Sequence, residues 1–190
     1  SCLSCFYTPT SGKVSFDGHN TTKLKPYDTC KLGITRTFQV VKTMGDLTVE
    51  ENVMIGAFLR HPDIPTARRK AAEALELTGL EHISDRLGKN LTIADRKRLE
   101  ITRALATEPK LLMLDETMAG LNPTETKEAM ELCLKLRDRG ITLIIVEHVM
   151  EAIMPIEEEL RRRRLQLRSA AGEGTEGNAS QHQLQRGILD

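Results

Sequence analysis

The chain has 190 residues, and its 27 Lys and Arg balance its 27 Asp and Glu, so the formal net charge is zero. This balance provides no global field to attract nucleic acid or an acidic membrane, and an aromatic content of 3% without Trp argues against base-stacking surfaces. No apolar run approaches the roughly 18 residues of a membrane span, so we expect any role at a membrane to come through a partner.

Residues 1–44 are expected to be rich in β-structure and loops. Turn signals at 10–12 and 17–18 enclose a short alternating strand at 14–16. Cys2 and Cys5 have the spacing of a metal or redox pair, but no second pair or His cluster completes a zinc site. We therefore expect these cysteines to act as small apolar residues, without a disulfide framework.

Three helices are expected between residues 48 and 107. Thr48 opens a capping-box pattern, followed by an apolar-periodic helix that the His-Pro pair at 61–62 ends. A second helix spans 66–78, and a third runs over about 93–107. The all-helical block from 48 to about 90 indicates an insertion, or a subdomain, carried on another core.

From residue 109 the pattern alternates between strand and helix. Strands are expected at 111–116 and 141–146, with a helix at about 123–138 between them. That alternation predicts a parallel sheet with right-handed crossovers. Asp115 and Glu116 end the first strand, at the edge where α/β sheets place their ligands. The first acid suits Mg²⁺, and the second suits a base that orients water.

The sequence contains no G-x-x-x-x-G-K-[ST] loop, the element that cradles phosphates. Taken with the two acids, this predicts much of a nucleotide hydrolase without the part that grips the nucleotide.

The pattern changes again after residue 154. Three acids at 157–159 face basic residues at 161–163 with i,i+4 spacing, which supports a solvated helix. The composition beyond Arg168 predicts disorder. The basic run could also bind phosphate groups or acidic lipid, but the neighbouring acids favour a neutralised, solvated helix.

Five segments in order resemble the ATP-binding subunit of an ABC transporter, specifically the branched-chain amino acid importer type. The resemblance covers roughly residues 3–154. It implies a partial P-loop NTPase (RecA-like) α/β domain, with a parallel sheet and an inserted helical subdomain at about 48–95, followed by an atypical charged tail at 155–190. The segments that carry it are Thr35-Arg36-Thr37-Phe38-Gln39, Arg98-Leu99-Glu100-Ile101 with Arg103-Ala104-Leu105-Ala106, Pro109 to Glu116, Ala119-Gly120-Leu121-Asn122-Pro123-Thr124-Glu125, and Val146-Glu147-His148.

The resemblance assigns catalytic and metal-binding roles to four residues. Gln39 matches the Q-loop glutamine, which touches the Mg²⁺ and attacking-water region and couples to the membrane partner. Asp115 matches the acid that ends the Walker B strand and serves Mg²⁺. Glu116 matches the general base at the γ-phosphate, and His148 matches the switch histidine there.

Two further residues are assigned to the interface with a second ATPase subunit. The signature loop falls on residues 91–95, where Thr92 keeps the capping hydroxyl while Ile93 and Ala94 replace glycines and restrict close approach. Asn122 stands in the D-loop where the family usually has Asp. The signature loop, at a helix N-terminus, offers backbone N–H groups to the nucleotide of the opposing subunit.

Two functions remain open on the sequence. In the first, the chain binds MgATP, pairs with a second ATPase subunit and drives transmembrane permease subunits at the inner face of the plasma membrane, without a nucleic-acid partner. In the second, it is a truncated, non-catalytic remnant that at most docks on a transporter partner. Two departures from the family limit the first function: the family's phosphate loop lies immediately upstream of the segment matched by residues 3–12, and residues 155–190 do not resemble the family.

Overall fold

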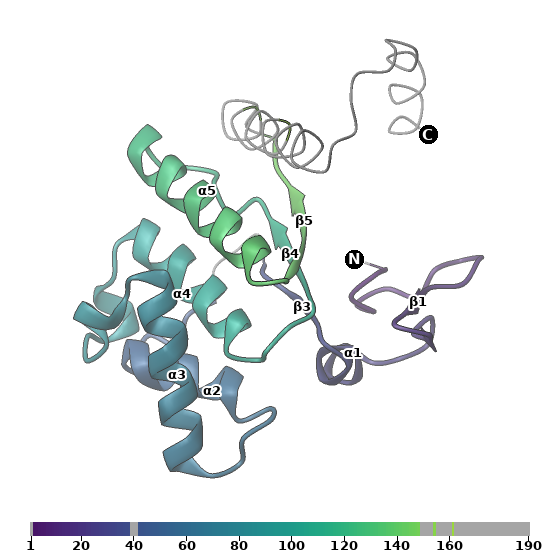
Figure 1. Ribbon diagram of the computed structural model, residues 1–190, viewed down its shortest axis with the longest axis horizontal. Coiled ribbons are helices and arrows are strands. Elements are labelled where there is room, and N and C mark those ends of the chain that lie inside the picture. The colour runs from purple at the N-terminus through teal and green to yellow at the C-terminus, as the bar shows by residue number, and fades with distance from the viewer. Residues whose placement is uncertain (1, 39–41, 149–153, 155–160, 162–190) are drawn as a thin grey trace, which may run out of the picture. The chain divides into compact units, whose positions relative to one another are not determined.

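The computed structural model describes residues 2–38, 42–148, 154 and 161. Its contacts divide the chain into two units, Ser1–Ile153 and Met154–Asp190, and every helix and strand named below lies in the first. Gln39 and nearly all of the predicted charged helix and tail lie outside the described residues (Figure 1).

The N-terminal region contains a small hairpin and one helix. Strands β1 (Ser15–Phe16) and β2 (His19–Asn20) pair antiparallel, and Asp17 and Gly18 between them have φ angles of 50° and 77°, as a tight primed turn requires. The predicted strand and turn are confirmed. Helix α1 (Pro26–Leu32) was not predicted, because it buries only Thr29 and therefore has no apolar periodicity.

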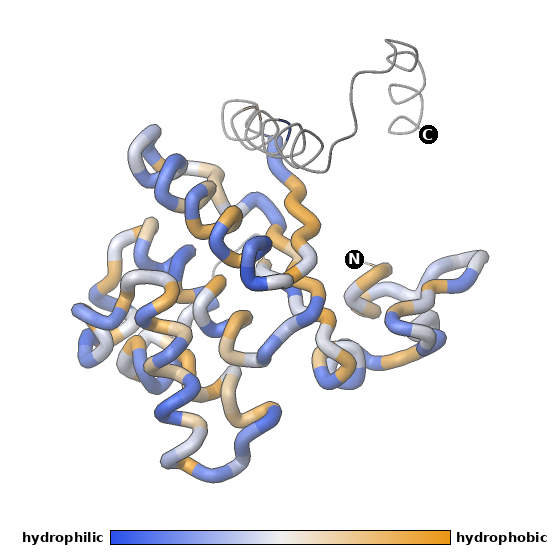
Figure 2. The backbone as a smooth tube through the Cα atoms, in the orientation of Figure 1, coloured by the Kyte–Doolittle hydropathy of each residue, from blue (hydrophilic) through white to orange (hydrophobic). Residues whose placement is uncertain are grey.

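The central sheet is parallel, as predicted, with the strand order β3-β4-β5. Strand β3 (Ile34–Arg36) pairs with β4 (Leu111–Asp115), which pairs with β5 (Thr142–Val146). Strand β4 is central and buried. Strand β5 is mostly hydrophobic (Figure 2), but it is only half-buried and leaves Val146 47% exposed. The carboxyl ends of β4 and β5 reach the same edge of the sheet.

Three helices pack together into a separate apolar core (Figure 1). These are α2 (Val49–Ala57), α3 (Ile64–Thr78) and α4 (Ile93–Leu105), and Thr48 closes the predicted capping box with Glu51. The buried residues of this core are Val49, Val53, Met54, Ala57, Ala67, Ala71, Ala74, Leu75, Leu80, Ile83, Leu91, Leu99 and Ala106. The helical block expected from the sequence is therefore present, and α4 also belongs to it.

The first helix of this block is shorter than predicted. It ends at Ala57, with Phe58 as its C-cap, and Ile55 and Phe58 are 39% and 40% exposed. These two apolar side chains therefore lie partly on the surface. The chain then turns toward α3, which begins two residues before the predicted start because Asp63 caps it through the Thr66 N–H.

Helix α5 (Pro123–Asp138) matches its predicted extent and contacts β5. Asn122 and Glu125 form its capping box, and Met130, Leu132, Cys133 and Leu136 are its buried residues. Short 3₁₀ helices at Glu81–Ile83 and Gly88–Asn90 link α3 to α4. Within the described ranges, no helix combines the length and the apolar character needed to cross a bilayer.

The contact between α2 and α4 yields a stability prediction. A Cβ on Gly56 would lie 2.2 Å from the backbone oxygen of Arg103, so Gly56→Ala must push the two helices apart. We expect a loss of about 2 kcal/mol or more in the free energy of unfolding, measured by denaturant titration. Gly45→Ala is the control, because its Cβ would meet only the Lys89 side chain and backbone at 3.3 Å and beyond. Equal stability of the two variants would contradict the close approach.

Candidate functional site

The carboxyl ends of β4 and β5 bring two predicted catalytic residues together. Asp115 pairs with Val146 in the parallel ladder, and the N–H of Glu116 donates to the Val146 carbonyl at 2.9 Å. The His148 Nε2 atom lies 3.3 Å from the Glu116 Oε1 atom. Glu116 is 25% exposed at its side chain and His148 79% exposed, so the pair opens to solvent from the edge of the sheet.

Glu116 has an unusual backbone conformation. Its φ angle is 49°, in the left-handed region that costs a residue with a Cβ about 1–2 kcal/mol. Such strain persists only where surrounding contacts hold it, and it concentrates at functional sites.

Asp115 does not stand free at the end of β4. Its carboxylate forms an ion pair with the Arg36 guanidinium, and both side chains are mostly buried, at 24% and 19% exposure. The sequence motif included Arg36, but nothing in local spacing showed that the two side chains meet across the sheet. A cation at Asp115 must therefore compete with Arg36.

The edge of the sheet offers one carboxylate donor suited to Mg²⁺. No cluster of three or more His, Cys, Asp or Glu able to hold a metal occurs among the described residues. Mg²⁺ in nucleotide sites usually takes one or two carboxylates together with phosphate oxygens and water. The Asp115 carboxylate, a hard oxygen donor at the ligand edge of a parallel sheet, fits that requirement.

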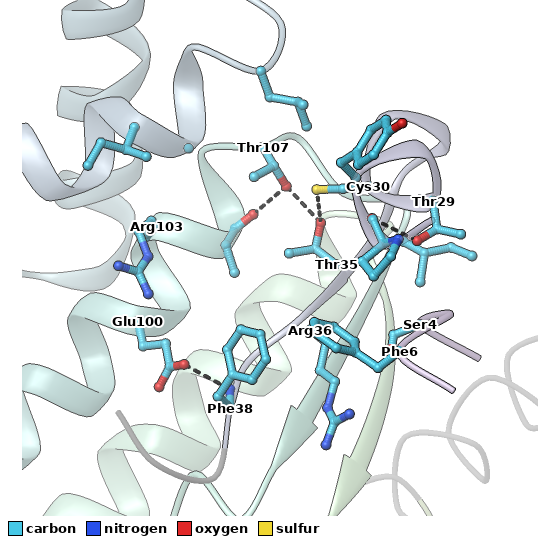
Figure 3. Close-up of a pocket in the computed structure, with 17 residues that line it drawn as sticks. Ser4, Phe6, Thr29, Cys30, Thr35, Arg36, Phe38, Glu100, Arg103 and Thr107 are labelled. Atoms are coloured by element: carbon cyan, nitrogen blue, oxygen red, sulfur yellow. Dashed lines mark hydrogen bonds between the residues drawn. The ribbon is translucent and has the colours of Figure 1, made fainter. Parts of the chain in front are cut away.

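Gln39 lies outside the described residues, but helix α4 holds the residues on both sides of it. The Phe38 N–H donates to the Glu100 carboxylate at 2.8 Å (Figure 3). The Arg103 guanidinium donates to the Lys42 carbonyl at 2.9 Å. Glu100 is only 4% exposed. The sequence motifs included Glu100 and Arg103 but assigned no role to either residue.

A largely apolar groove lies beside Phe38. It encloses about 370 Å³ between the N-terminal region, β3, α2 and α4, and Phe6 meets the Phe38 ring edge-on at 5.4 Å. Figure 3 shows Arg36, Glu100 and Arg103 around this groove. Its lining residues are Ser4, Phe6, Pro26, Tyr27, Thr29, Cys30, Ile34, Thr35, Arg36, Phe38, Ile55, Gly56, Leu59, Glu100, Arg103, Ala104 and Thr107.

Thr92 and Asn122 each begin a helix. The Thr92 hydroxyl accepts the Asp95 N–H at 3.1 Å, and the Asn122 side chain accepts the Glu125 N–H at 3.0 Å. Both residues are exposed, and Ile93 beside Thr92 is 68% exposed. The structure thus places these two residues at separate helix N-termini, where backbone N–H groups and the helix dipole favour an anion.

Known proteins resemble this chain in sequence. A family model described as ABC transporter matches residues 1–119. The high-affinity branched-chain amino acid transport ATP-binding protein LivG of Escherichia coli (strain K12) is 37% identical over 175 residues, which cover 84% of this chain and 69% of LivG. The Pseudomonas aeruginosa protein BraF, with the same description, is 34% identical over 176 residues and is covered to 69%.

The fold has solved counterparts. The crystal structure of a nucleotide-free ATP-binding cassette from an ABC transporter aligns with a TM-score of 0.72 and 28% identity, over 82% of this chain and 66% of that one. The chain therefore spans about two thirds of the length of that cassette. These similarities confirm the predicted fold class, the P-loop NTPase fold with a parallel sheet.

Burial of Glu100 yields a pH prediction. Burial raises the pKa of its carboxyl, while the Phe38 N–H, Arg103 and Lys97 partly offset that rise. The carboxyl of Glu100 therefore stays protonated in the folded protein at pH values where it is already ionised in the unfolded chain, whose ordinary pKa is 4.5. The contribution of Glu100 to the free energy of unfolding is complete at low pH and falls as the pH rises through the raised pKa, so it is lost at neutral pH.

Glu100→Gln removes this titration and keeps an oxygen that can accept the Phe38 N–H. We expect the free energy of unfolding of the variant, relative to the parent, to increase from pH 4.5 to pH 7, measured by urea titration at each pH. The exposed Glu76 on α3 supplies the control variant Glu76→Gln. A difference that is constant with pH would contradict the shifted pKa.

Proposed function

This chain belongs to the ABC transporter family, and from that premise we propose that it is an ATP-binding and ATP-hydrolysing subunit of an importer for branched-chain amino acids. The observation that carries the proposal is the Glu116–His148 pair, which stands beside Asp115 at the ligand edge of the parallel sheet. The branched-chain amino acid solute is suggested by the names of LivG and BraF. The chain spans 69% of LivG, so the activity is inferred for the part that carries these residues.

The geometry suggests how the pair would act on a bound nucleotide. The Glu116 carboxylate faces the open edge of the sheet, where it can accept a proton from the water that attacks the γ-phosphate. His148, within 3.3 Å of it, can donate a hydrogen bond to a γ-phosphate oxygen. When bound, Mg²⁺ would neutralise charge on the phosphate oxygens. Asp115 would hold it, together with Gln39, and Arg36 would have to release Asp115.

A second ATPase subunit supports the same chemistry. We assign Thr92 and Asn122 to the surface that meets it, because both residues are exposed at helix N-termini. One similar solved cassette, with a TM-score of 0.69 and 26% identity over 78% of this chain and 68% of that one, is a dimer bound to ADP and Pi.

The groove beside Phe38 is the proposed contact with the membrane partner. It is lined by Phe38, which directly precedes Gln39 in the sequence, and by other aromatic and aliphatic side chains. Of these, Tyr27 and Phe6 are still 55% and 45% exposed. An apolar segment of a permease subunit fits such a surface. Docking there would hold the chain at the inner face of the plasma membrane, with no nucleic-acid partner involved.

Calorimetric titration of MgATP into the purified chain tests the proposal. The sequence has no phosphate-loop motif, so the affinity of the remaining residues decides it. We expect a dissociation constant in the micromolar range, about −8 kcal/mol. An absence of binding at millimolar nucleotide would overturn ATP hydrolysis by this chain and favour the non-catalytic remnant.

Substitution of the proposed base then separates binding from chemistry. Glu116→Gln keeps the size of the side chain and removes its basicity, so we expect unchanged MgATP binding and a fall in turnover of about 10²–10⁴-fold, followed as phosphate release. Glu76→Gln, on the exposed face of α3, is the matched control. Unchanged hydrolysis in Glu116→Gln would remove the base assignment.

A further inference from the structure

The turn after β4, residues 116–119, is held by two side chains outside the turn. The Lys97 ammonium of α4 donates to the Glu116 carbonyl at 3.3 Å and also to the Ala119 carbonyl. The Glu147 carboxylate accepts the Met118 N–H at 2.8 Å and the Thr117 hydroxyl at 3.4 Å. The turn is therefore contacted by α4 and by the residue that follows β5.

The strain at Glu116 explains why such contacts are needed. A left-handed φ at a residue with a Cβ is unfavourable by itself, so neighbours must stabilise it. The Glu116 N–H is bonded to Val146, and its carbonyl is bonded to Lys97. Both polar groups of the strained residue are thus paired with groups from other elements.

The partial burial of Lys97 and of the Glu147 carboxylate lowers the stability of the fold. Burial lowers the pKa of Lys97, and the charges of Glu147, Glu100 and Glu116 act in the opposite direction. The Glu147 Oε2 atom is shielded from solvent and has no hydrogen-bond partner in the described part of the chain. A buried carboxylate oxygen without a partner costs about 1–3 kcal/mol or more. The chain retains this charge directly between Val146 and the proposed catalytic His148.

We propose that Lys97 and Glu147 are positioning residues, which hold the 116–119 turn through separate hydrogen bonds and thereby fix the Glu116 carboxylate beside His148. This inference rests on the proposed function for its consequence, because Glu116 and His148 are the proposed reacting pair. Lys97 also lies one and a half turns after Thr92 on α4. The turn that carries the base is thereby tied to the helix that begins at the proposed dimer surface.

Backbone measurements on the full chain test the contacts themselves. In Glu147→Ala we expect the Met118 amide to exchange with solvent about tenfold faster, because it loses a hydrogen bond to a charged group. Glu147→Gln keeps an acceptor oxygen and should restore near-parental exchange. In Lys97→Met the carbonyl ¹³C shifts of Glu116 and Ala119 should change, and Lys97→Arg should return them toward the parent.

The controls are Glu131→Ala and Lys127→Met, two exposed positions on α5, and denaturant titration confirms that each variant is folded. Unchanged Met118 exchange in Glu147→Ala, or unchanged carbonyl shifts in Lys97→Met, would overturn the proposal. These spectroscopic outcomes do not depend on ATP turnover.

Kinetics then test the consequence. With the parent active, Lys97→Met should lower kcat about tenfold or more while KM stays unchanged, with recovery in Lys97→Arg, because the base is misplaced but nucleotide contacts remain. A change in KM alone would overturn the positioning role. A parent that does not hydrolyse MgATP would instead refute the proposed function, and the amide and carbonyl results would still decide whether the turn is held as described.

Discussion

The register between β4 and β5 is the constraint on which the candidate site depends. Asp115 lies opposite Val146 in a parallel ladder, so the residues that follow each strand emerge side by side at one edge. A shift of one residue would turn every side chain of a strand to the other face of the sheet. Glu116 and His148 would then no longer meet, and Glu147 would no longer reach the Met118 N–H.

Helix α4 connects this edge to the rest of the molecule. One part of its surface places Leu99 in the apolar core that it shares with α2 and α3. Other positions extend Lys97 to the turn that carries Glu116, and Glu100 and Arg103 to the backbone on either side of 39–41. A displacement of α4 would therefore be felt at both places, because the hydrogen bonds join side chains of one rigid helix to backbone atoms of two different loops.

The sequence predicted those elements whose residues repeat with a clear period or carry caps. Thr48 marks a helix start that the structure reproduces with Glu51, and the apolar run before Asp115 marks the buried strand. Helix α1 was not predicted because it has almost no buried face. Pro26 and Gly33 nevertheless provide start and stop signals at its two ends.

The candidate site was predicted in the same uneven way. Asp115 ends a strand, Glu116 and His148 follow strands, and all three fit a family motif, so the sequence was enough to propose them. Their partners could not be found by local reasoning. Arg36 meets Asp115 across the sheet, and Lys97 reaches Glu116 from α4. Such contacts depend on the tertiary arrangement, and no regular residue spacing in the sequence predicts them.

Stabilising and destabilising features lie in different regions of the described structure, the helical core and the ligand edge of the sheet. The helical core is built from small and aliphatic residues, many of them fully buried, which gain free energy on folding through apolar burial. The ligand edge of the sheet contains a left-handed Glu116, a buried Glu100 and an unpaired oxygen of Glu147, all of which cost free energy. Because α4 belongs to both regions, the favourable packing of the first can hold the unfavourable arrangement of the second in place. Unfavourable groups concentrated at one edge are typical of a site kept for chemistry and not for stability.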